Sequence, residues 1–256
     1  MNSFADEVNS RIADNRTNRV LTEAAQAFLV ASAEAKYSYN FSWLGRPIIQ
    51  YPQDMVAVEE IVWRIKPDLI IETGIAHGGS LVYSASLLAL LDMCEAIEAG
   101  TTLDPARSRR KVLGVDIDIR KHNRAAIEAH PMKSRIDMIE GSALAPDVID
   151  RVRRSAQGYE RVLVCLDSNH THDHVLAELE AYAHLTTVGS YCIVFDTLVE
   201  DMPETTYPDR PWGPGDNPKT AVHQFLRTHP EFVIDQAIQD KLLITVAPDG
   251  YLRRVS

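Results

Sequence analysis

Residues 67–80 read Pro67-Asp-Leu-Ile-Ile-Glu-Thr-Gly-Ile-Ala-His-Gly-Gly-Ser80, an apolar run that leads through an acid into a glycine-rich turn. The run Leu69–Glu72 is apolar without clean alternation, which is typical of a strand covered on both faces of a parallel sheet. The glycines permit a tight turn and let the backbone approach a ligand at the N-terminus of the following helix. We therefore predict a strand, a ligand-binding loop and a helix, in this order.

Four further apolar runs of the same kind follow, each succeeded by turn residues and a helical pattern. These runs are Val112–Val115, Ile136–Ile139, Val162–Leu166 and Tyr191–Phe195. The helices predicted between the runs are Ser80–Leu91, Arg120–Ala129, Pro146–Arg154 and His174–Ala183. Strands that alternate with helices in this way predict a doubly wound α/β sheet with right-handed crossovers.

The C-terminal end departs from this alternation. A helix near Thr220–Arg227 is followed by predicted strands at Phe232–Asp235 and Leu242–Val246 and by a turn at Pro248–Gly250. Because only six residues separate the two runs, the strands are expected to be antiparallel neighbours. A mostly parallel sheet with an antiparallel C-terminal strand pair is similar to the Rossmann-like sheet of class I methyltransferases, and less similar to the nicotinamide-binding sheet.

Two segments lie outside this frame. Residues 1–50 are predicted to form a helical cap or an oligomer contact ahead of the main domain, residues 51–256. The stretch Met202–Pro218 carries five prolines, which exclude it from a helix or a central strand. A loop of this length in a compact domain is usually functional.

Composition limits the classes of partner and compartment. The net charge of −10 disfavours nucleic acid, which is bound through clustered cations. The most apolar stretch, Leu81–Ile97, is interrupted by Asp92 and Glu95 and is too short to span a membrane. The first residues have charges of both signs and no apolar core, so we expect no signal peptide and a cytoplasmic protein. An odd number of widely spaced cysteines fits a reducing compartment: Cys94, Cys165 and Cys192.

The glycine turn after the first strand favours one cofactor over another. A dinucleotide loop, G-x-G-x-x-G, needs a glycine where this chain has Ala76. The stretch is instead similar to the E-x-G-x-x-x-G-x-S loop of S-adenosylmethionine enzymes, in which an acid and backbone amides hold the amino-acid part of the cofactor. The alternative is a plain strand–helix turn. The predicted cofactor contacts are Glu72, Gly74, His77, Gly78 and Ser80.

The next two strand tips supply further candidates for cofactor binding. Asp116 ends the second strand, where an acid accepts the ribose hydroxyls in dinucleotide folds. Its alternative role is a helix N-cap, although Asp118 is better placed for that. Ser142 follows the third strand and is predicted to lie beside the adenine. Asp167, at the fourth tip, completes the predicted cofactor set.

Carboxylates at the fourth and fifth strand tips predict a metal site. Asp167 opens the stretch Asp-Ser-Asn-His-Thr-His-Asp-His, and Asp196 follows the fifth strand. The tips of adjacent parallel strands meet at one edge, where open α/β sheets bind ligands. Two facing carboxylates would repel each other without a cation, and hard oxygen ligands favour Mg²⁺, with manganese or calcium as alternatives. Thr197 is the predicted third ligand. The alternative is that Asp167 only caps the following helix.

His170 is the candidate general base, because histidine titrates near neutral pH and can remove a proton from a substrate hydroxyl. It follows Asp167 by three residues, the spacing of the D-x-x-K tip in metal-dependent catechol-type O-methyltransferases. His172 and His174 lie nearer the helix. The sequence leaves open whether they support the site residues or are only structural. A zinc site built from the three histidines is disfavoured, because their spacing suits no single rigid geometry and no H-E-x-x-H accompanies them.

Together, the stretches at 67–80, 114–118, 167–175 and 195–197 resemble the cephalosporin hydroxylase family, which also contains rhamnosyl O-methyltransferases. The resemblance implies a class I methyltransferase fold, S-adenosyl-L-methionine and Mg²⁺ as cofactors, and a homo-oligomer. This chain departs from the family at Phe195. At the fifth strand tip, antibiotic-pathway members look like Glu-Asp, whereas this chain has Phe195-Asp196. The third metal ligand therefore stays open between Thr197, Glu200, Asp201 and water.

These features predict an S-adenosylmethionine-dependent, divalent-metal-assisted O-methyltransferase. Its expected partner is a small molecule with a hydroxyl group, either a sugar or a glycosylated natural product. Binding to nucleic acid or to a membrane is not expected. Tyr207, Trp212 and Asn217 in the proline-rich loop are predicted to form the substrate wall, or else a contact with another subunit. One alternative is a hydroxylase or oxygenase with a metal at the same site. A non-catalytic module that binds nicotinamide or adenosine is the other.

Overall fold

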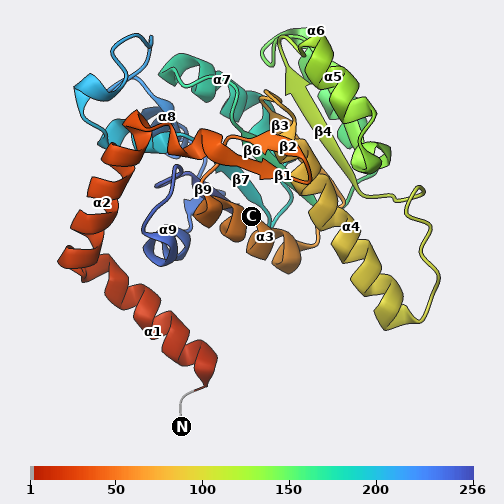
Figure 1. Ribbon diagram of the computed structural model, residues 1–256, viewed down its shortest axis with the longest axis horizontal. Helices are drawn as coiled ribbons and strands as arrows, with labels where there is room; N and C mark the ends of the chain where they lie inside the picture. Colours follow the sequence, from red (N-terminus) through yellow and green to blue (C-terminus); the bar gives the residue numbers. More distant parts are fainter. Residues whose placement is uncertain (1–2) are drawn as a thin grey trace.

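The computed structural model describes residues 3–256, in which a seven-stranded sheet lies between layers of helices (Figure 1). The strands, in sheet order, are β5 (Ile136–Glu140), β4 (Lys111–Asp116), β3 (Leu69–Thr73), β6 (Val162–Leu166), β7 (Tyr191–Val194), β9 (Tyr251–Arg254) and β8 (Phe232–Ile234). The first five run parallel, whereas β9 is antiparallel to both of its neighbours. The predicted doubly wound, mostly parallel α/β sheet with an antiparallel C-terminal pair is confirmed.

The second strand of the C-terminal pair lies later in the chain than predicted. The prediction of a strand at Leu242–Val246 is wrong, because helix α9 (Gln236–Leu242) occupies the gap and β8 pairs with β9 instead. Leu243 has a left-handed φ of 60°, which stops an extended run at its start. The N–H of Val246 donates to the buried side chain of Asp54 at 2.9 Å instead of to a strand. The apolar residues of this run therefore pack as a loop.

The two faces of the sheet carry separate hydrophobic cores. On β3, Ile70 faces one core, whereas Leu69 and Ile71 face the other, as the two-residue period of a strand requires. The helices over the first face are α3 (Pro52–Ile65), α4 (Gly79–Ala99) and α5 (Lys121–Glu128). Those over the second face are α6 (Pro146–Ala156), α7 (His172–Tyr182) and α8 (Pro218–Phe225).

Helix α4 is longer than predicted and belongs to the core. By length and composition it could cross a membrane, but half of its most apolar window is buried inside the protein. It extends past Leu91 to Ala99 and ends at Gly100, whose φ of 63° is typical of a helix C-cap. Asp92, on this extension, pairs with Arg110 and with the buried Arg135. These ion pairs hold the end of the helix against the loop before β4.

The N-terminal segment contains two helices and a small hairpin. Helices α1 (Phe4–Thr17) and α2 (Arg19–Glu34) project to one side of the sheet in Figure 1. A two-stranded hairpin, β1 (Phe41–Trp43) and β2 (Arg46–Ile48), follows within the segment that the sequence predicts as a helical cap. The side chain of Gln26 on α2 donates to the carbonyl of Asp201 at 2.7 Å. The segment therefore contacts the loop that follows β7.

Glycine 74 lets two strand tips meet. It has a φ of +90°, and a Cβ built on it would lie 2.0 Å from the carbonyl oxygen of Asp167. Gly100, by contrast, has a φ of +63° and nothing within 4 Å of such a Cβ. Both glycines have a left-handed backbone conformation, but only at Gly74 would a side chain also clash with a neighbouring residue.

Gly74→Ala is expected to lower the free energy of unfolding by about 3 kcal/mol or more, because a backbone clash adds to the left-handed penalty. Gly100→Ala, the matched control, should lose only about 1 kcal/mol, from the backbone conformation alone. Urea denaturation of both variants measures the difference. Equal losses would show that the contact between Gly74 and Asp167 is not tight.

Candidate active site

A cleft of about 1000 Å³ lies at the carboxyl ends of β3, β6 and β7. The glycine loop after β3 forms one wall, and the tips of β6 and β7 form its base. The proline-rich loop, residues 202–218, and the hairpin β1–β2 contribute the remaining sides. This is the edge at which open α/β sheets bind their ligands.

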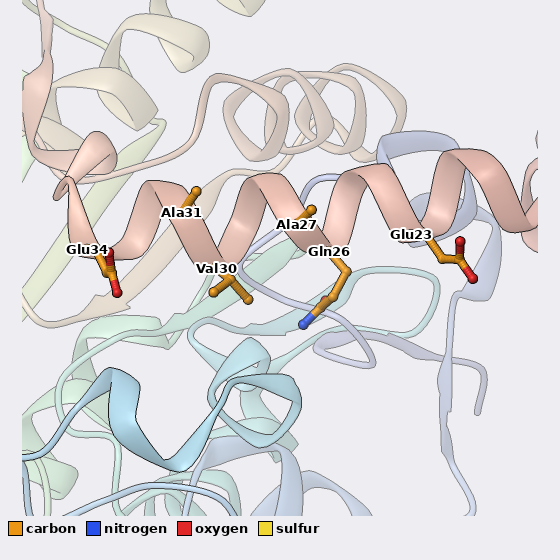
Figure 2. Close-up of a pocket in the computed structure, with 6 residues that line it drawn as sticks. All are labelled: Glu23, Gln26, Ala27, Val30, Ala31 and Glu34. Atoms are coloured by element: carbon orange, nitrogen blue, oxygen red, sulfur yellow. The ribbon is translucent and has the colours of Figure 1, made fainter.

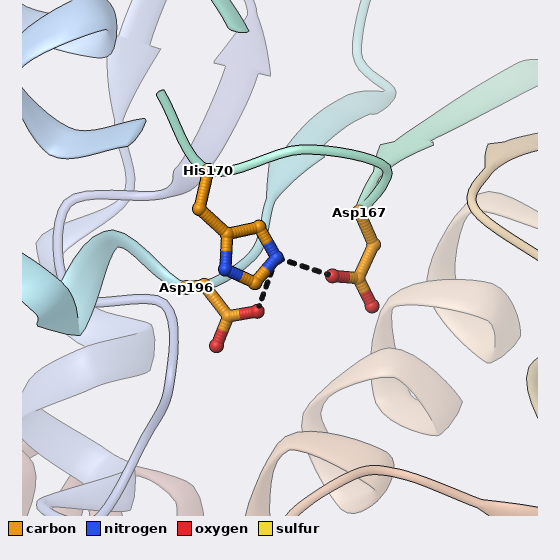
Figure 3. Close-up of side chains that lie close together, drawn as sticks. All are labelled: Asp167, His170 and Asp196. Carbon is orange, nitrogen blue, oxygen red and sulfur yellow. Dashed lines mark ion pairs between the residues drawn. The ribbon is translucent and has the colours of Figure 1, made fainter. Parts of the chain in front are cut away.

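Three of the side chains that line this cleft lie close together, as Figure 3 shows. The Nε2 atom of His170 lies 3.1 Å from Oδ2 of Asp196 and 3.8 Å from Oδ1 of Asp167. One ligand atom from each residue lies within 4.8 Å of the other two. The side chains keep between 24% and 34% of their surface exposed, so a ligand in the cleft can reach them. We call Asp167, His170 and Asp196 the acid–histidine cluster.

The electrostatics of the acid–histidine cluster favour an added positive charge. Burial, together with the charge of Asp196, raises the pKa of Asp167 to about 7. Burial alone would lower the pKa of His170, but the two carboxylates outweigh it and raise the pKa to about 9. Asp196 also has a left-handed φ of 56°, a conformation that aspartate tolerates better than most residues. The backbone therefore holds this carboxylate beside its neighbour despite their repulsion.

The acid–histidine cluster fits a divalent cation. Two carboxylates and an imidazole nitrogen offer donors that bind Mg²⁺ or a similar metal, and a cation between the carboxylates would relieve their repulsion. Within residues 3–256, the buried Nδ1 atom of His170 has no hydrogen-bond partner, so no protein group fixes the ring through that atom. The ring instead lies against Trp212, with centroids 4.9 Å apart.

The other predicted metal ligands lie outside the acid–histidine cluster. Thr197 is fully buried, and its hydroxyl donates to the carbonyl of Pro248 at 2.6 Å, so the prediction that it is a ligand is not supported by its position. Glu200 accepts the N–H of Gly215 at 2.8 Å. Asp201 pairs with Lys219 at 2.7 Å. Glu200 therefore supports the proline-rich loop, whereas Asp201 contacts the first turn of α8.

Only one of the three clustered histidines lines the cleft. Helix α7 begins at His172, two residues earlier than predicted, and this places the other two on the helix. His172 binds the hydroxyl of Thr220 at 2.7 Å through Nδ1, so it links α7 to α8. His174 lies 3.1 Å from the hydroxyl of Ser168 and so supports the loop between β6 and α7.

Most of the predicted cofactor contacts in the glycine loop line the cleft: Glu72, Gly74, His77 and Ser80. Glu72 is buried, and burial raises its pKa while the hydroxyls of Ser84 and Ser80 partly offset this. Gly78 is the exception, because it faces helix α5 and not the cleft. A Cβ built on Gly78 would lie 2.4 Å from the side chain of Ile127 on α5.

Two other predicted contacts do not line the cleft: Asp116 and Ser142. One carboxylate oxygen of Asp116 accepts the N–H groups of Ile75 and Ala76, at 2.8 and 3.1 Å. Its other oxygen accepts the N–H of Asp118 at 3.1 Å. Asp116 therefore holds the glycine loop in place, and its contact with a ribose stays a prediction.

The proline-rich loop supplies two of the three predicted wall residues. Tyr207 and Trp212 line the cleft and pack edge-on, with ring centroids 4.8 Å apart. Asn217 does not reach it, because its buried side chain caps α8 by accepting the N–H groups of Lys219 and Thr220. The aromatic wall is therefore formed by Tyr207 and Trp212.

Asp54 is a cleft residue that the sequence did not reveal. It lies in the first turn of α3, where an acid usually serves the helix dipole. Here it is buried and accepts the hydroxyl of Tyr251 at 2.6 Å and the N–H of Val246 at 2.9 Å. Burial raises its pKa to about 6. Its partners lie about 190 residues away in the chain, so no local pattern could identify them.

A second, shallower hollow of about 640 Å³ lies on α2 (Figure 2). Its lining residues are Glu23, Gln26, Ala27, Val30, Ala31 and Glu34. It is mostly apolar and has no group of clustered acids or histidines. Catalytic chemistry is therefore assigned to the cleft and not to this hollow.

Comparison with known proteins agrees with this geometry. The model of the family described as rhamnosyl O-methyltransferase/CmcI matches residues 35–255. Rhamnosyl O-methyltransferase of Mycobacterium leprae is 29% identical over 215 residues, which are 83% of this chain and 82% of that protein. The enzyme of the same name from Mycobacterium tuberculosis is 28% identical over 249 residues, 92% of this chain and 91% of the relative.

Solved structures share the fold. The structure described as CmcI-D160 with Mg and S-adenosylmethionine has a TM-score of 0.56 at 18% identity, covering 85% of this chain and 78% of that one. The apo-structure of CmcI-N160 has a TM-score of 0.58 at 20% identity, covering 85% and 77%. A possible O-methyltransferase of Klebsiella pneumoniae has a TM-score of 0.52 at 13% identity, covering 91% and 90%.

The fold is thus that of class I methyltransferases, with the glycine loop and the acid–histidine cluster at the sheet edge where ligands bind. The family match spans most of the chain, including every strand of the large sheet. The chain belongs to the rhamnosyl O-methyltransferase/CmcI family and is an S-adenosylmethionine-dependent O-methyltransferase.

Proposed function

We propose that this enzyme methylates a hydroxyl of a sugar or a glycosylated small molecule, with the help of a divalent cation held by Asp167 and Asp196. The observation that carries the proposal is the convergence of these two carboxylates with His170 in the cleft that the glycine loop also lines. The mycobacterial relatives are named for methylation of a rhamnosyl group, which supports a sugar as the acceptor. The aromatic rings of Tyr207 and Trp212 offer flat apolar faces beside the cluster.

The carboxylates of Asp167 and Asp196 would hold the cation, and His170 lies within reach of the same position. A bound Mg²⁺ would lower the pKa of the acceptor hydroxyl and fix its oxygen. The glycine loop, through Glu72, His77 and Ser80, would hold the amino-acid part of S-adenosylmethionine. Catalysis then depends mainly on the alignment of the acceptor oxygen with the sulfonium methyl group.

We further propose that His170 accepts the proton of the acceptor hydroxyl on its Nε2 atom. The two carboxylates raise the pKa of His170 to about 9 in the empty site, so the ring would become a base only once a cation bound between them offsets their charge. Nε2 faces the space between the carboxylates, so an oxygen held there lies within hydrogen-bond reach of it. Trp212, packed on the imidazole, limits the rotation of the ring. The competing role for the same atom is third metal ligand, since Thr197 points elsewhere. The two roles differ in what the loss of His170 does to metal affinity.

Three expectations about organisation remain proposals. We propose a cytoplasmic enzyme, which is supported by three free cysteines, two of them buried. A homo-oligomer and the division into a cap, residues 1–50, and a S-adenosylmethionine-dependent methyltransferase domain, residues 51–256, are proposed alongside. Light scattering of the purified protein measures the oligomeric state, and limited proteolysis near residue 50 tests the division into cap and domain.

Incubation with S-adenosylmethionine, Mg²⁺ and a panel of aryl glycosides and simple phenols is expected to methylate glycosides, with rhamnosides first in the panel. Mass spectrometry identifies the product, which should gain one CH₂ on the sugar ring. Methylation confined to the phenols would refute the sugar acceptor. Gain of an oxygen atom would support the oxygenase alternative and refute methyl transfer to this acceptor.

Asp167→Asn and Asp196→Asn should each lower methyl transfer by about 100-fold or more, because each removes a charged ligand of the cation. Binding of S-adenosylhomocysteine, measured by calorimetry without metal, should stay near the wild-type value in Asp196→Asn, because Asp196 is not among the predicted cofactor contacts. Asp209→Asn is the matched control, since Asp209 also lines the cleft but lies outside the acid–histidine cluster. The metal proposal fails if the control loses as much activity, or if chelation of divalent cations leaves turnover unchanged.

His170→Gln is expected to reduce turnover by about 100-fold to 10,000-fold, the usual contribution of a general base. Affinity for Mg²⁺, followed by calorimetry, should change little. His172→Gln is the control, because His172 binds Thr220 and does not line the cleft. A large loss of Mg²⁺ affinity in His170→Gln would instead identify the residue as a metal ligand.

A further inference from the structure

The β1–β2 hairpin, residues 41–48, lies against the helix that follows the glycine loop. Its turn residues Leu44 and Gly45 both have a positive φ, 44° and 83°, as a two-residue type I′ turn requires. Trp43 donates its indole N–H to the hydroxyl of Ser86 on α4 at 2.9 Å. The hairpin is therefore fixed to α4 near the helix N-terminus.

The contact at the start of α4 is very close. A Cβ built on Gly79 would lie 2.1 Å from the carbonyl oxygen of Pro47, so only glycine fits at the first residue of the helix. Both residues line the cleft, together with Ile48. The hairpin is thus part of the wall on the cofactor side.

Arg46 reaches from the hairpin to the back of the glycine loop. Its Nε donates to the carbonyl of His77 at 3.0 Å, and Nη2 donates to the same oxygen. Nη2 also donates to the side-chain oxygen of Asn123 at 3.0 Å. Asn123, which is 3% exposed, in turn donates to the carbonyl of Ala76 at 2.9 Å. Two consecutive carbonyls of the loop are held by side chains that do not line the cleft.

These bonds determine where the loop's free N–H group points. A trans peptide has its N–H opposite its carbonyl, so with the Ala76 oxygen held by Asn123, the N–H of His77 is directed away from Asn123. Within residues 3–256, that N–H donates to no protein acceptor, whereas the N–H groups of Ile75 and Ala76 bind Asp116. Ala76 keeps an unfavourable φ of 45° in this arrangement. The loop therefore needs outside support to present its free donor.

We propose that Arg46 and Asn123 are positioning residues of the cofactor site. They orient the peptides of Ala76 and His77 so that the His77 N–H, together with the first N–H groups of α4, receives the carboxylate of S-adenosylmethionine. Neither side chain touches the reacting atoms. The inference depends on the family's use of S-adenosylmethionine, and it is independent of the metal, of His170 and of the acceptor.

Calorimetry with S-adenosylhomocysteine, in the absence of metal and acceptor, tests this role. Arg46→Met is expected to weaken binding by about tenfold, because hydrogen bonds from a charged donor are lost. Arg46→Lys should recover part of the affinity. With saturating S-adenosylmethionine, kcat should stay close to wild type while KM for S-adenosylmethionine rises, the pattern of lost ground-state binding.

Arg254→Met is the matched control. Arg254 is also half-buried on a strand and donates to backbone carbonyls, those of His184 and Thr186, at 2.9 and 2.7 Å. It should lower the melting temperature without changing the affinity for S-adenosylhomocysteine. Unchanged affinity in Arg46→Met, or an equal loss in Arg254→Met, overturns the proposal. If Arg46→Met does not fold, Asn123→Ala decides: weaker binding supports the role, and wild-type affinity overturns it.

Discussion

The backbone contact between Gly74 and Asp167 is the constraint that joins the two halves of the active site. Parallel pairing places Thr73 of β3 beside Leu166 of β6, so the chain leaves both strands at the same level. The N–H of Asp167 donates to the carbonyl of Thr73 at 3.0 Å, and Gly74 has no side chain to separate the two tips. The glycine loop and the first carboxylate of the cluster therefore lie side by side as a consequence of strand register.

The same register brings together groups that destabilise the empty site. The N–H of Phe195 donates to the carbonyl of Leu166 at 3.0 Å, which aligns the tips of β6 and β7 and sets Asp196 near Asp167. Two carboxylates in a partly buried position repel each other. The fold tolerates this because His170 lies against both of them and because the strands are held elsewhere by a fully buried core. A ligand that supplies positive charge would bind only the folded arrangement and would stabilise it.

The sequence predicted the parallel strands well, because each is a short apolar run buried on both faces, and burial of this kind leaves a continuous signal. The same signal misled at Leu242–Val246, where apolar residues pack in a loop around Asp54. The hairpin at 41–48 was missed because its turn is Leu44–Gly45 and lacks the Asn-Gly or Asp-Gly that marks most type I′ turns. The first failure concerns a contact between residues far apart in the chain, whereas the second concerns a local turn without its usual sequence signal.

The site residues divide in the same way. The position of Asp167 and His170 in the cleft could be predicted because strand tips gather ligands, a rule that needs only the order of the strands. The orientation of Thr197 could not be predicted, because it depends on the carbonyl of Pro248, 51 residues away in the chain. Asp116 was predicted to contact the ribose, and in the structure it binds the glycine loop. The sequence does not distinguish an acid that contacts a ligand from one that holds the loop.

The hydrogen bonds of the glycine loop show which of its neighbours hold the loop in place. Buried backbone groups need partners, and a loop with a strained residue such as Ala76 leaves several groups outside any regular structure. Asp116 takes two N–H groups from one side, while Arg46 and Asn123 take two carbonyls from the other. What remains is a donor on His77 at the wall of the cleft. In the role that we propose, side chains from β4, α5 and the N-terminal hairpin stay behind the loop and satisfy its other polar groups. The loop would then have fewer conformations to lose when the cofactor binds.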